Sequence, residues 1–324
     1  MKTTLRRMQI GWAIRCAPFL LLAASLAACS EPPASAPPAD VAAPGKLQEE
    51  PLGLLFGVYT TDTPADAVKK FRPLLDAVER RLGDDLDRPV RIRTQVYGDY
   101  GSGLEAVVEG EVDFARLGPA SYVLASQRSD GVDLLAMETR KGSKTFYGIL
   151  CVHADSEIAS VAELAGRRVA FGDENSTIGR YLSQQLLLEH GLQAEDLAGF
   201  EYLGRHDLVG HAVGMGKFSA GALKESTFRK LVKQEVPLRE LARFPNVTKP
   251  WVSTGRLDPG LSAALQGALL EIRDPKALAR VGKSPFAEAS ADDYEVIRTS
   301  MNDNYRFFER AGHDEGEPGT RAVR

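Results

Sequence analysis

The chain contains little cysteine and histidine, and this scarcity excludes several kinds of site. Its 324 residues include three cysteines and five histidines. Cys16 and Cys29 lie in the N-terminal segment, so only Cys151 remains in the body and no internal disulfide can form there. His206 and His211 are five residues apart, which is a poor helical pair for a metal, and no cysteine cluster accompanies them. We therefore expect neither a metal site nor a cofactor.

Motifs for nucleotide or ester chemistry are also missing. A P-loop requires Gly-x-x-x-x-Gly-Lys followed by Ser or Thr, but the segment that ends in Gly282-Lys283-Ser284 begins with Ala277. No Gly-x-Ser-x-Gly elbow occurs, and the many single carboxylates define no acid–base pair. The sequence thus predicts a protein that is not an enzyme. The catalytic alternative is a hydrolase of a phosphonate or an ester, which the release of phosphate would identify.

Basic residues are outnumbered by acidic ones. The formal net charge is −4, and removal of residues 1–28 would take away four basic side chains and make it −8. Phosphate backbones call for a basic face, so we expect no nucleic acid as a partner. A small anion remains possible because a few local donors decide its affinity.

The N-terminal segment has the pattern of a secretory signal. Basic residues precede a short apolar stretch, residues 17–28, which ends in Leu26-Ala27-Ala28-Cys29. A cysteine directly after small residues resembles a bacterial lipobox, in which the cysteine carries the lipid. An ordinary signal peptide with a chance cysteine is the alternative. No later run of 18 apolar residues occurs, so the expected attachment to a membrane is the lipid on Cys29.

A proline-rich stretch follows Cys29 and predicts a tether rather than a packed element. We therefore expect a periplasmic body held on a membrane by lipid. Ser30 stands directly after Cys29, and in many Gram-negative bacteria a residue other than aspartate at this position sorts lipoproteins to the outer membrane.

Short apolar strands alternate with amphipathic helices, which is typical of an α/β fold. The expected strands are residues 52–59, 90–96, 112–117, 146–152, 168–171, 200–203 and 218–223. The first expected helix is capped by Thr63 and has Pro64 in its first turn. Its apolar stripe is Val68, Phe71, Leu75, Val78 and Leu82. The end of the chain is expected to be helical and to pack on the first lobe.

This alternation, over a length typical of two domains, predicts two α/β lobes joined by a hinge. The chain should cross between them near residues 140–145 and 244–251. The expected parts are a signal peptide (1–28), a tether (29–50), lobe 1 (51–143 and 248–312), lobe 2 (144–247) and a disordered tail (313–324). Ligands of such sheets sit at the carboxyl ends of strands, where loops lead into helix N-termini.

Three strand-to-helix junctions are candidate binding positions. At the first, a strand ending at Phe171 leads through a polar loop into a helix that opens on Ser176 and Thr177. Free N–H groups and two hydroxyls there would hold an anion, although simple helix capping explains the same residues. At the second, Gly118-Pro119 leads to Ser121, and a tight connection is the alternative.

The third junction contains His206 and Asp207. Asp207 is a candidate ligand-binding residue, with simple helix capping as the alternative, and His206 can be either a ligand donor or a solvated side chain. Tyr100 and Tyr147 can each place a hydroxyl in the cleft, although a lone tyrosine is more often half-buried core.

Four segments, taken together and in order, resemble one family. They read VDFARLGPASYVLA, FYGILCVHADSEIASVAELAGRRVAFGDENSTIGRYL, YLGRHDLVGHAV and FSAGALKESTFRKL. The chain is similar, over about residues 52–308, to the periplasmic phosphate/phosphite/phosphonate-binding proteins of ABC importers. This resemblance implies a type II periplasmic-binding-protein clamshell that closes on an oxyanion.

The resemblance also implies roles for individual residues. Its ligand shell maps to Tyr100, Tyr147, Ser176, Thr177 and His206. Glu225 corresponds to an acid that accepts from the amino group of a phosphonate.

Three positions depart from the family pattern. Ile178 replaces a small or hydroxyl residue, Lys224 stands beside Glu225, and Lys249 stands near the expected place of a second acid. These changes favour a simpler or more highly charged oxyanion over an aminoalkylphosphonate.

The resulting hypothesis is a monomeric, lipid-anchored binding protein that delivers a phosphorus oxyanion to an ABC permease in the inner membrane. The alternative is a sensor subunit that presents its closed form to a membrane receptor kinase. Neighbouring genes for a permease and an ATPase would favour transport, and a neighbouring histidine kinase gene would favour sensing.

Overall fold

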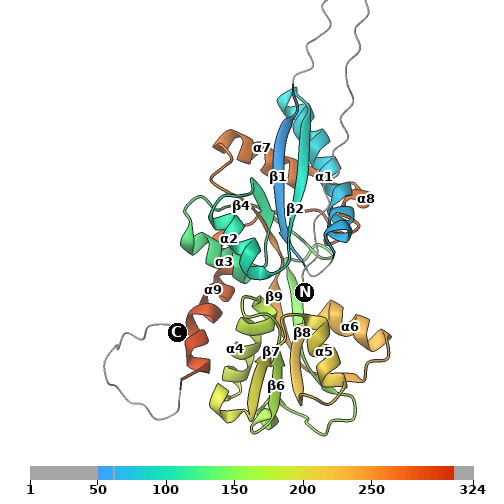
Figure 1. The fold of residues 1–324 in the computed structure, drawn as a ribbon, viewed down its shortest axis with the longest axis vertical. Coiled ribbons are helices and arrows are strands. Elements are labelled where there is room, and N and C mark those ends of the chain that lie inside the picture. Colours follow the sequence, from blue (N-terminus) through green and yellow to red (C-terminus); the bar gives the residue numbers. More distant parts are fainter. Residues whose placement is uncertain (1–49, 61–62, 310–324) are drawn as a thin grey trace, which may run out of the picture. The chain divides into compact units, whose positions relative to one another are not determined.

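The computed structural model describes residues 50–60 and 63–309, which contain two five-stranded sheets (Figure 1). Both sheets belong to one compact unit of the chain. The predicted signal peptide, lipidated Cys29, tether and C-terminal tail lie outside the described residues. Within these residues, no helix combines the length and apolarity that crossing a bilayer requires.

The first sheet is mixed and has the strand order β2-β1-β3-β10-β4. Strand β1 pairs in parallel with β2 and β3, whereas β10 runs antiparallel to β3 and β4. The strands are β1 (Leu52–Tyr59), β2 (Val90–Tyr97), β3 (Phe114–Arg116), β4 (Asp133–Met137) and β10 (Pro250–Ser253). The associated helices are α1 (Pro64–Leu86), α2 (Tyr100–Val108), α3 (Pro119–Arg128), α7 (Pro259–Glu271) and α8 (Pro275–Leu278).

Helix α1 begins as its sequence predicts. The Thr63 hydroxyl accepts from the Asp66 N–H at 3.2 Å, and Pro64 occupies the first turn. The stripe is buried from Phe71 to Leu82, but Val68 is 39% exposed. The prediction for Val68 was therefore wrong, because at this turn of α1 the buried face is occupied by Ala67 and Val68 points away from it.

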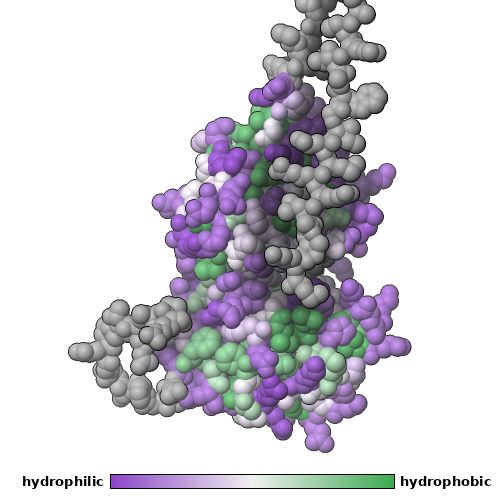
Figure 2. Space-filling view, viewed as in Figure 1, coloured by the Kyte–Doolittle hydropathy of each residue, from purple (hydrophilic) through white to green (hydrophobic). Residues whose placement is uncertain are grey.

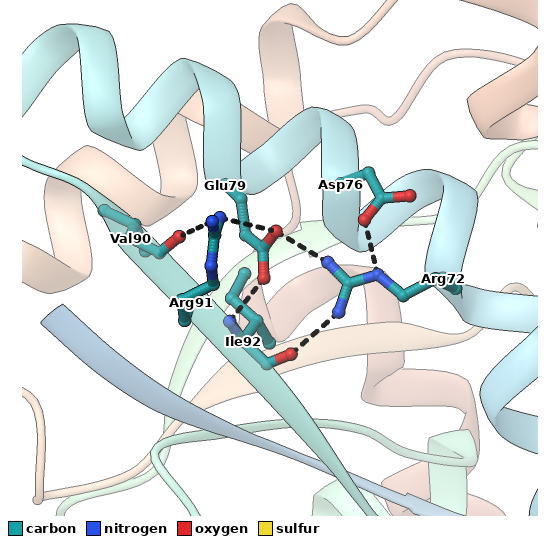
Figure 3. A network of polar contacts seen from close by, with 6 residues as sticks. All are labelled: Arg72, Asp76, Glu79, Val90, Arg91 and Ile92. Carbon is teal, nitrogen blue, oxygen red and sulfur yellow. Dashed lines mark hydrogen bonds and ion pairs between the residues drawn. The ribbon is translucent and has the colours of Figure 1, made fainter. Parts of the chain in front are cut away.

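A charged network fastens α1 to the edge strand β2 (Figure 3). Glu79 accepts from the Ile92 N–H at 2.6 Å, and Arg72 donates to the Ile92 carbonyl at 2.9 Å. Arg72 also contacts Glu79 at 2.7 Å and Asp76 at 2.5 Å. The network satisfies an N–H and a carbonyl of an edge strand that has a pairing partner on one side only.

The second sheet has the strand order β7-β6-β8-β5-β9. Strand β6 is parallel to β7 and β8, and β5 is antiparallel to β8 and β9. The strands are β5 (Thr145–His153), β6 (Arg168–Phe171), β7 (Gly199–Tyr202), β8 (Ala220–Lys224) and β9 (Leu238–Val247). The helices are α4 (Leu182–Glu189), α5 (His206–Gly214) and α6 (Glu225–Lys233), with short turns η1 (Val161–Leu164), η2 (Thr177–Tyr181) and η3 (Ala194–Asp196).

The chain passes from one sheet to the other at two places between strands. Residues 138–144 lead from β4 to β5, and residues 248–249 lead from β9 to β10. The second connection contains Thr248 and Lys249 only. Strand β10 thus returns to the middle of the first sheet, where it pairs with β3 and β4.

The C-terminal helices divide between the two sheets. Helices α7 and α8 pack on α1, as predicted; α9 (Glu295–Asn302) contacts α3 of the first sheet and also η2 and α4 of the second, whereas η5 (Asp303–Phe307) contacts α4. The Asn304 amide donates to Gln184 Oε1 at 2.7 Å, and the ring of Phe307 lies 5.9 Å from that of Phe171. The prediction that the whole C-terminal end packs on the first lobe was therefore wrong for η5, and it holds only in part for α9, which contacts both lobes.

Each sheet has a dense core. In the first, Trp251 stacks on Phe56 with ring centroids 4.8 Å apart. In the second, Cys151 is fully buried, and burial raises the pKa of its thiol to about 12, so it acts as a packing residue. Hydrophobic residues are more prominent in the lower half of the face drawn in Figure 2 than in its upper half.

Candidate functional site

A cavity of about 900 Å³ lies between elements of the two sheets. The first sheet contributes the carboxyl-terminal ends of β1 and β3, with Tyr59 and Arg116, and the start of α2, with Tyr100. The second contributes the end of β8 and the start of α5, with Lys224 and His206. Lys249 enters the wall from the short connection between the sheets. The cavity therefore lies where strand ends meet helix starts, as an α/β fold predicts.

The start of α3 is held in place by a buried tyrosine. The Tyr59 hydroxyl accepts from the Gly118 N–H at 2.5 Å and shares a 3.0 Å hydrogen bond with Ser121 Oγ. A Cβ at Gly118 would lie 2.6 Å from Tyr59 Oη and 3.8 Å from Lys249 Nζ. Only glycine can stand this close to the Tyr59 hydroxyl, because any side chain would collide with it. The Lys249 ammonium lies on the same side of Gly118, beside the N-terminus of α3.

Ser176 and Thr177 lie at the corresponding junction of the second sheet, and both are buried. Ser176 Oγ accepts from the Gly179 N–H at 3.0 Å, so the capping role is present. Thr177 Oγ1 accepts from the Ala120 N–H at 2.9 Å. A hydroxyl can donate while it accepts, so both retain an O–H for a ligand.

Two hydrogen bonds connect the junctions of the two sheets. One is the bond from Ala120 to Thr177, and the other runs from the Tyr100 hydroxyl to Ser176 Oγ at 3.5 Å. Ile178, which departs from the family pattern, is buried in the hydrophobic core beside these residues. It therefore contributes packing and not a polar group.

His206 opens α5 and faces the cavity. Burial and the nearby ammonium groups of Lys224 and Lys249 lower the pKa of its imidazole to about 3, so it is neutral at pH 7. Its Nδ1 atom is buried and has no hydrogen-bond partner among the described residues. Asp207, next to it, pairs with Arg205 at 2.7 Å, and this pairing lowers the pKa of its carboxyl.

Lys224 and Lys249 are cavity lysines whose ammonium groups have strongly lowered pKa values. Burial and the neighbouring cations, Arg116 first among them, lower the pKa of Lys224 to about 8. Burial and the charge of Lys224 lower the pKa of Lys249 well below its ordinary value. In the part of the chain that the structure describes, neither ammonium has a hydrogen bond or an ion pair. Lys249 Nζ lies 5.7 Å from the centroid of the Tyr59 ring.

The third cation, Arg116, already has a carboxylate partner. It forms a two-pronged ion pair with buried Glu138, whose Oε1 also accepts from Trp251 Nε1 at 3.2 Å. Although burial opposes ionisation, Arg116, Lys249 and Trp251 hold the pKa of Glu138 below its ordinary value. Glu138 is therefore an anion committed to Arg116.

Two further carboxylates on the wall serve the local backbone. Asp99 accepts from the Ser102 N–H at 2.8 Å and caps α2. Asp173 accepts from the Asn175 N–H at 2.8 Å, while burial, with a smaller effect of Asp99, raises the pKa of its carboxyl. Neither carboxylate forms an ion pair with Lys224 or Lys249.

Five of the eight sequence-predicted residues do not line the cavity, and two of these, Tyr147 and Glu225, point to other partners. Tyr147 is 37% exposed on β5, with the Arg243 guanidinium 5.1 Å from its ring centroid. Glu225 pairs with Arg229 at 2.6 Å and with Arg243 at 3.2 Å. Tyr100, His206 and Asp207 line the cavity. Ser121, Ser176 and Thr177 form the layer beneath its wall.

Sequence reasoning missed Tyr59 and Arg116. Both stand at the carboxyl end of a predicted strand, and that position could have identified them as wall residues. No group of three or more metal-ligating side chains occurs among residues 50–60 and 63–309.

The model of one protein family matches residues 56–294: "ABC transporter, phosphonate, periplasmic substrate-binding protein". Among curated proteins, the chain is 27% identical to the phosphonates-binding periplasmic protein of Escherichia coli over 42% of this chain and 40% of that protein. It is 25% identical to the phosphate-import protein PhnD of Mycolicibacterium smegmatis over 53% of this chain and 54% of that protein. The matches thus span about half the length of these relatives.

Solved structures share the fold. XAC2383 from Xanthomonas citri, bound to chloride ion, has a TM-score of 0.67 at 23% identity, over 79% of this chain and 98% of that chain. PhnD1 from Prochlorococcus marinus, in complex with methylphosphonate, has a TM-score of 0.65 at 22% identity, over 79% of this chain and 100% of that chain. These similarities confirm the predicted two-lobe clamshell fold.

Proposed function

Since the chain belongs to the family of periplasmic substrate-binding proteins of phosphonate ABC transporters, we propose that it binds a phosphorus oxyanion outside the cytoplasm and delivers it to an ABC permease. The relatives above are named for the binding or import of phosphonates and phosphate, and none is named as an enzyme. The predicted absence of catalytic motifs agrees with their names.

The observation that carries the proposal is the pair of lysine ammonium groups in the cavity wall that have no hydrogen bond or ion pair among the described residues. Lys249 lies beside the α3 N-terminus, and the positive end of a helix dipole favours an anion there. Lys224 adds a second positive charge. An oxyanion at this position would reduce the mutual repulsion of the two lysines, which the Glu138 carboxylate, bound to Arg116, relieves only in part.

The remaining donors come from residues beside that position. Ser176 and Thr177 each accept a backbone or side-chain hydrogen bond and keep an O–H to donate. Tyr100 bonds to Ser176 and lines the cavity, so its hydroxyl can turn to the ligand. In the bound state, the unpartnered Nδ1 of the neutral His206 would accept a hydrogen bond from a protonated oxygen of the ligand.

The test is calorimetric titration of the purified chain, stripped of bound ligand by unfolding and refolding. The panel is phosphate, phosphite, methylphosphonate and sulfate. We expect micromolar or tighter binding of at least one phosphorus oxyanion, with no heat from sulfate. Silence across the panel in a folded protein would refute the proposed function, and release of inorganic phosphate from an ester would reassign the chain as a hydrolase.

We also propose that the body is lipid-anchored through Cys29, with Ser30 favouring the outer membrane. The lipobox pattern supports the anchor. Labelled palmitate should enter the wild-type chain and not the Cys29→Ala variant, which should fractionate with soluble periplasmic proteins. Equal labelling of the two would contradict the anchor, and labelled protein in the inner membrane would contradict the sorting.

A further inference from the structure

Two lysines on the cavity wall lack a carboxylate partner among the described residues, and their positions bear on the ligand. Arg116 is neutralised by Glu138, and Arg205 is neutralised by Asp207. Lys224 and Lys249 have no such partner in the described residues. We therefore expect anionic groups of the ligand to neutralise the ammonium groups of Lys224 and Lys249.

The carboxylates on the wall are not placed to supply it. Glu138 is bound to Arg116, and Asp207 is bound to Arg205. Asp99 and Asp173 accept backbone N–H groups in their own caps. The charge of Asp173 is further disfavoured, because burial raises its pKa. An ammonium group on a ligand would therefore meet two lysines without a carboxylate partner, whereas the wall carboxylates Asp99 and Asp173 already accept backbone N–H groups.

The positions of the two lysines suggest two subsites. Lys249 lies beside the α3 N-terminus, close to the hydroxyls of Tyr59 and Ser121. Lys224 ends β8 and directly precedes α6, whose first turn contributes Ser226 and Thr227 to the wall. The two ammonium groups are close enough that the charge of Lys224 is the main electrostatic effect on the pKa of Lys249. A ligand with one anionic group at the α3 N-terminus and a second at the start of α6 would give each lysine its own partner.

The size of the cavity agrees with two subsites. Its volume of about 900 Å³ is in the range of pockets that hold molecules larger than a simple oxyanion, roughly 300–1,000 Å³. From these observations we propose that the ligand is a phosphorus oxyanion with a second anionic group, a carboxylate or a second phosphoryl group, and that Lys224 and Lys249 select for that group. This inference rests on the proposed function and specifies its ligand.

The test compares matched ligands by calorimetry on the ligand-free chain at pH 7.5. Methylphosphonate and ethylphosphonate have no second anionic group, phosphonoacetate and 3-phosphonopropionate add a carboxylate, pyrophosphate adds a phosphoryl group, and 2-aminoethylphosphonate adds an ammonium. We expect phosphonoacetate or pyrophosphate to bind at least about tenfold more tightly than methylphosphonate, the effect of one charged hydrogen bond. We expect 2-aminoethylphosphonate to bind more weakly than ethylphosphonate.

Variants identify the residues responsible. Lys224→Gln and Lys249→Gln should each reduce the preference for the second anionic group to less than about threefold, since each removes one charged partner. Lys233→Gln is the matched control, because Lys233 is exposed at the other end of α6 and does not line the cavity. It should leave the preference unchanged. Circular dichroism melting checks that each variant is folded.

The outcomes separate the inference from the function beneath it. Equal binding of methylphosphonate and both kinds of doubly anionic ligand would overturn the inference and leave the proposed function intact. Tightest binding of 2-aminoethylphosphonate would do the same. If no phosphorus oxyanion binds, the proposed function fails and the inference fails with it. Preference for pyrophosphate alone or phosphonocarboxylates alone would support the inference and identify the second group.

Discussion

The two sides of the cavity satisfy their polar groups very differently. On the hydroxyl side, Tyr59, Ser121, Ser176 and Thr177 are joined to backbone N–H groups or to one another. On the lysine side, the ammonium groups of Lys224 and Lys249 have no partner within the described residues. The hydroxyl side is therefore preorganised and stabilises the fold, whereas the lysine side is incomplete until a ligand arrives.

The largest expected effect comes from removing the incomplete side. In the double variant Lys224→Gln/Lys249→Gln, the binding free energy of a phosphorus oxyanion should weaken by about 3–6 kcal/mol, because two charged hydrogen bonds are lost. The melting temperature should stay the same or rise, because the repulsion between two cations disappears. Calorimetry and melting curves test both points. A double variant that binds as tightly as the wild type would place the ligand elsewhere.

The hydroxyl side should contribute less per residue. We expect Ser176→Ala and Thr177→Ala each to weaken binding by about 1–3 kcal/mol, one hydrogen bond to a charged group. Ser126→Ala is the control, because its hydroxyl bonds only to the Val123 carbonyl within α3. Unchanged affinity in folded Ser176 and Thr177 variants would show that the two hydroxyls only stabilise the local backbone and do not bind the ligand.

A smaller effect is expected in the pH dependence of the free energy of unfolding, and the pKa of Lys224 fixes its direction. The pKa of Lys224 is lowered to about 8 in the folded chain, whereas an unfolded lysine titrates near ~10.4. Between these values the unfolded chain binds more protons, so this lysine makes the free energy of unfolding rise with pH. Its unfavourable contribution, about 1–3 kcal/mol, is full below pH 8 and fades toward pH 10.

Urea unfolding of the ligand-free protein measures this contribution. Lys224→Gln should be more stable than the wild type at pH 7, and its advantage should shrink by pH 9.5. Because other lysines and tyrosines titrate in both proteins, only the difference between the two is informative. An advantage that does not change with pH would mean that Lys224 is not electrostatically strained.

The smallest effect is expected for Glu225, which belongs to neither side. Arg229 and Arg243 hold its carboxylate in ion pairs off the cavity wall. We expect Glu225→Gln to change the dissociation constant of methylphosphonate by less than about threefold, as for other exposed ion pairs. A loss of tenfold or more would bring Glu225 into the ligand shell and show that α6 rearranges on binding.

Much of the fold could be predicted from local patterns. Strand β1 (Leu52–Tyr59) and the Thr63 cap follow from an apolar run and from helix-start chemistry, and both are found. Strands β4, β9 and β10 were not predicted. β4 is short and lacks alternation, and the β9 sequence carries charges and Pro245, which an edge strand tolerates. The four residues of β10 become a strand through pairing with β3 and β4, which are distant in sequence.

The candidate site, too, depends on contacts between residues that are distant in sequence. Sequence comparison marked Lys224 and Lys249 as unusual, since the family pattern has no lysines there. Their lack of partners could not be predicted, because it depends on Glu138 being taken by Arg116 and on Glu225 being taken by Arg229 and Arg243. Such competition between charges is decided by three-dimensional distances and not by residue type.

The packing of η5 means that the two halves are not interchangeable modules. Phe307 and Asn304 follow the last strand of the first sheet, yet they complete the apolar and polar surroundings of Phe171 and Gln184 in the second. A fragment of residues 144–247 expressed by itself would expose those groups to water and should aggregate or remain partly unfolded. Any recombination of this body with a relative must therefore exchange the C-terminal segment together with the middle of the chain.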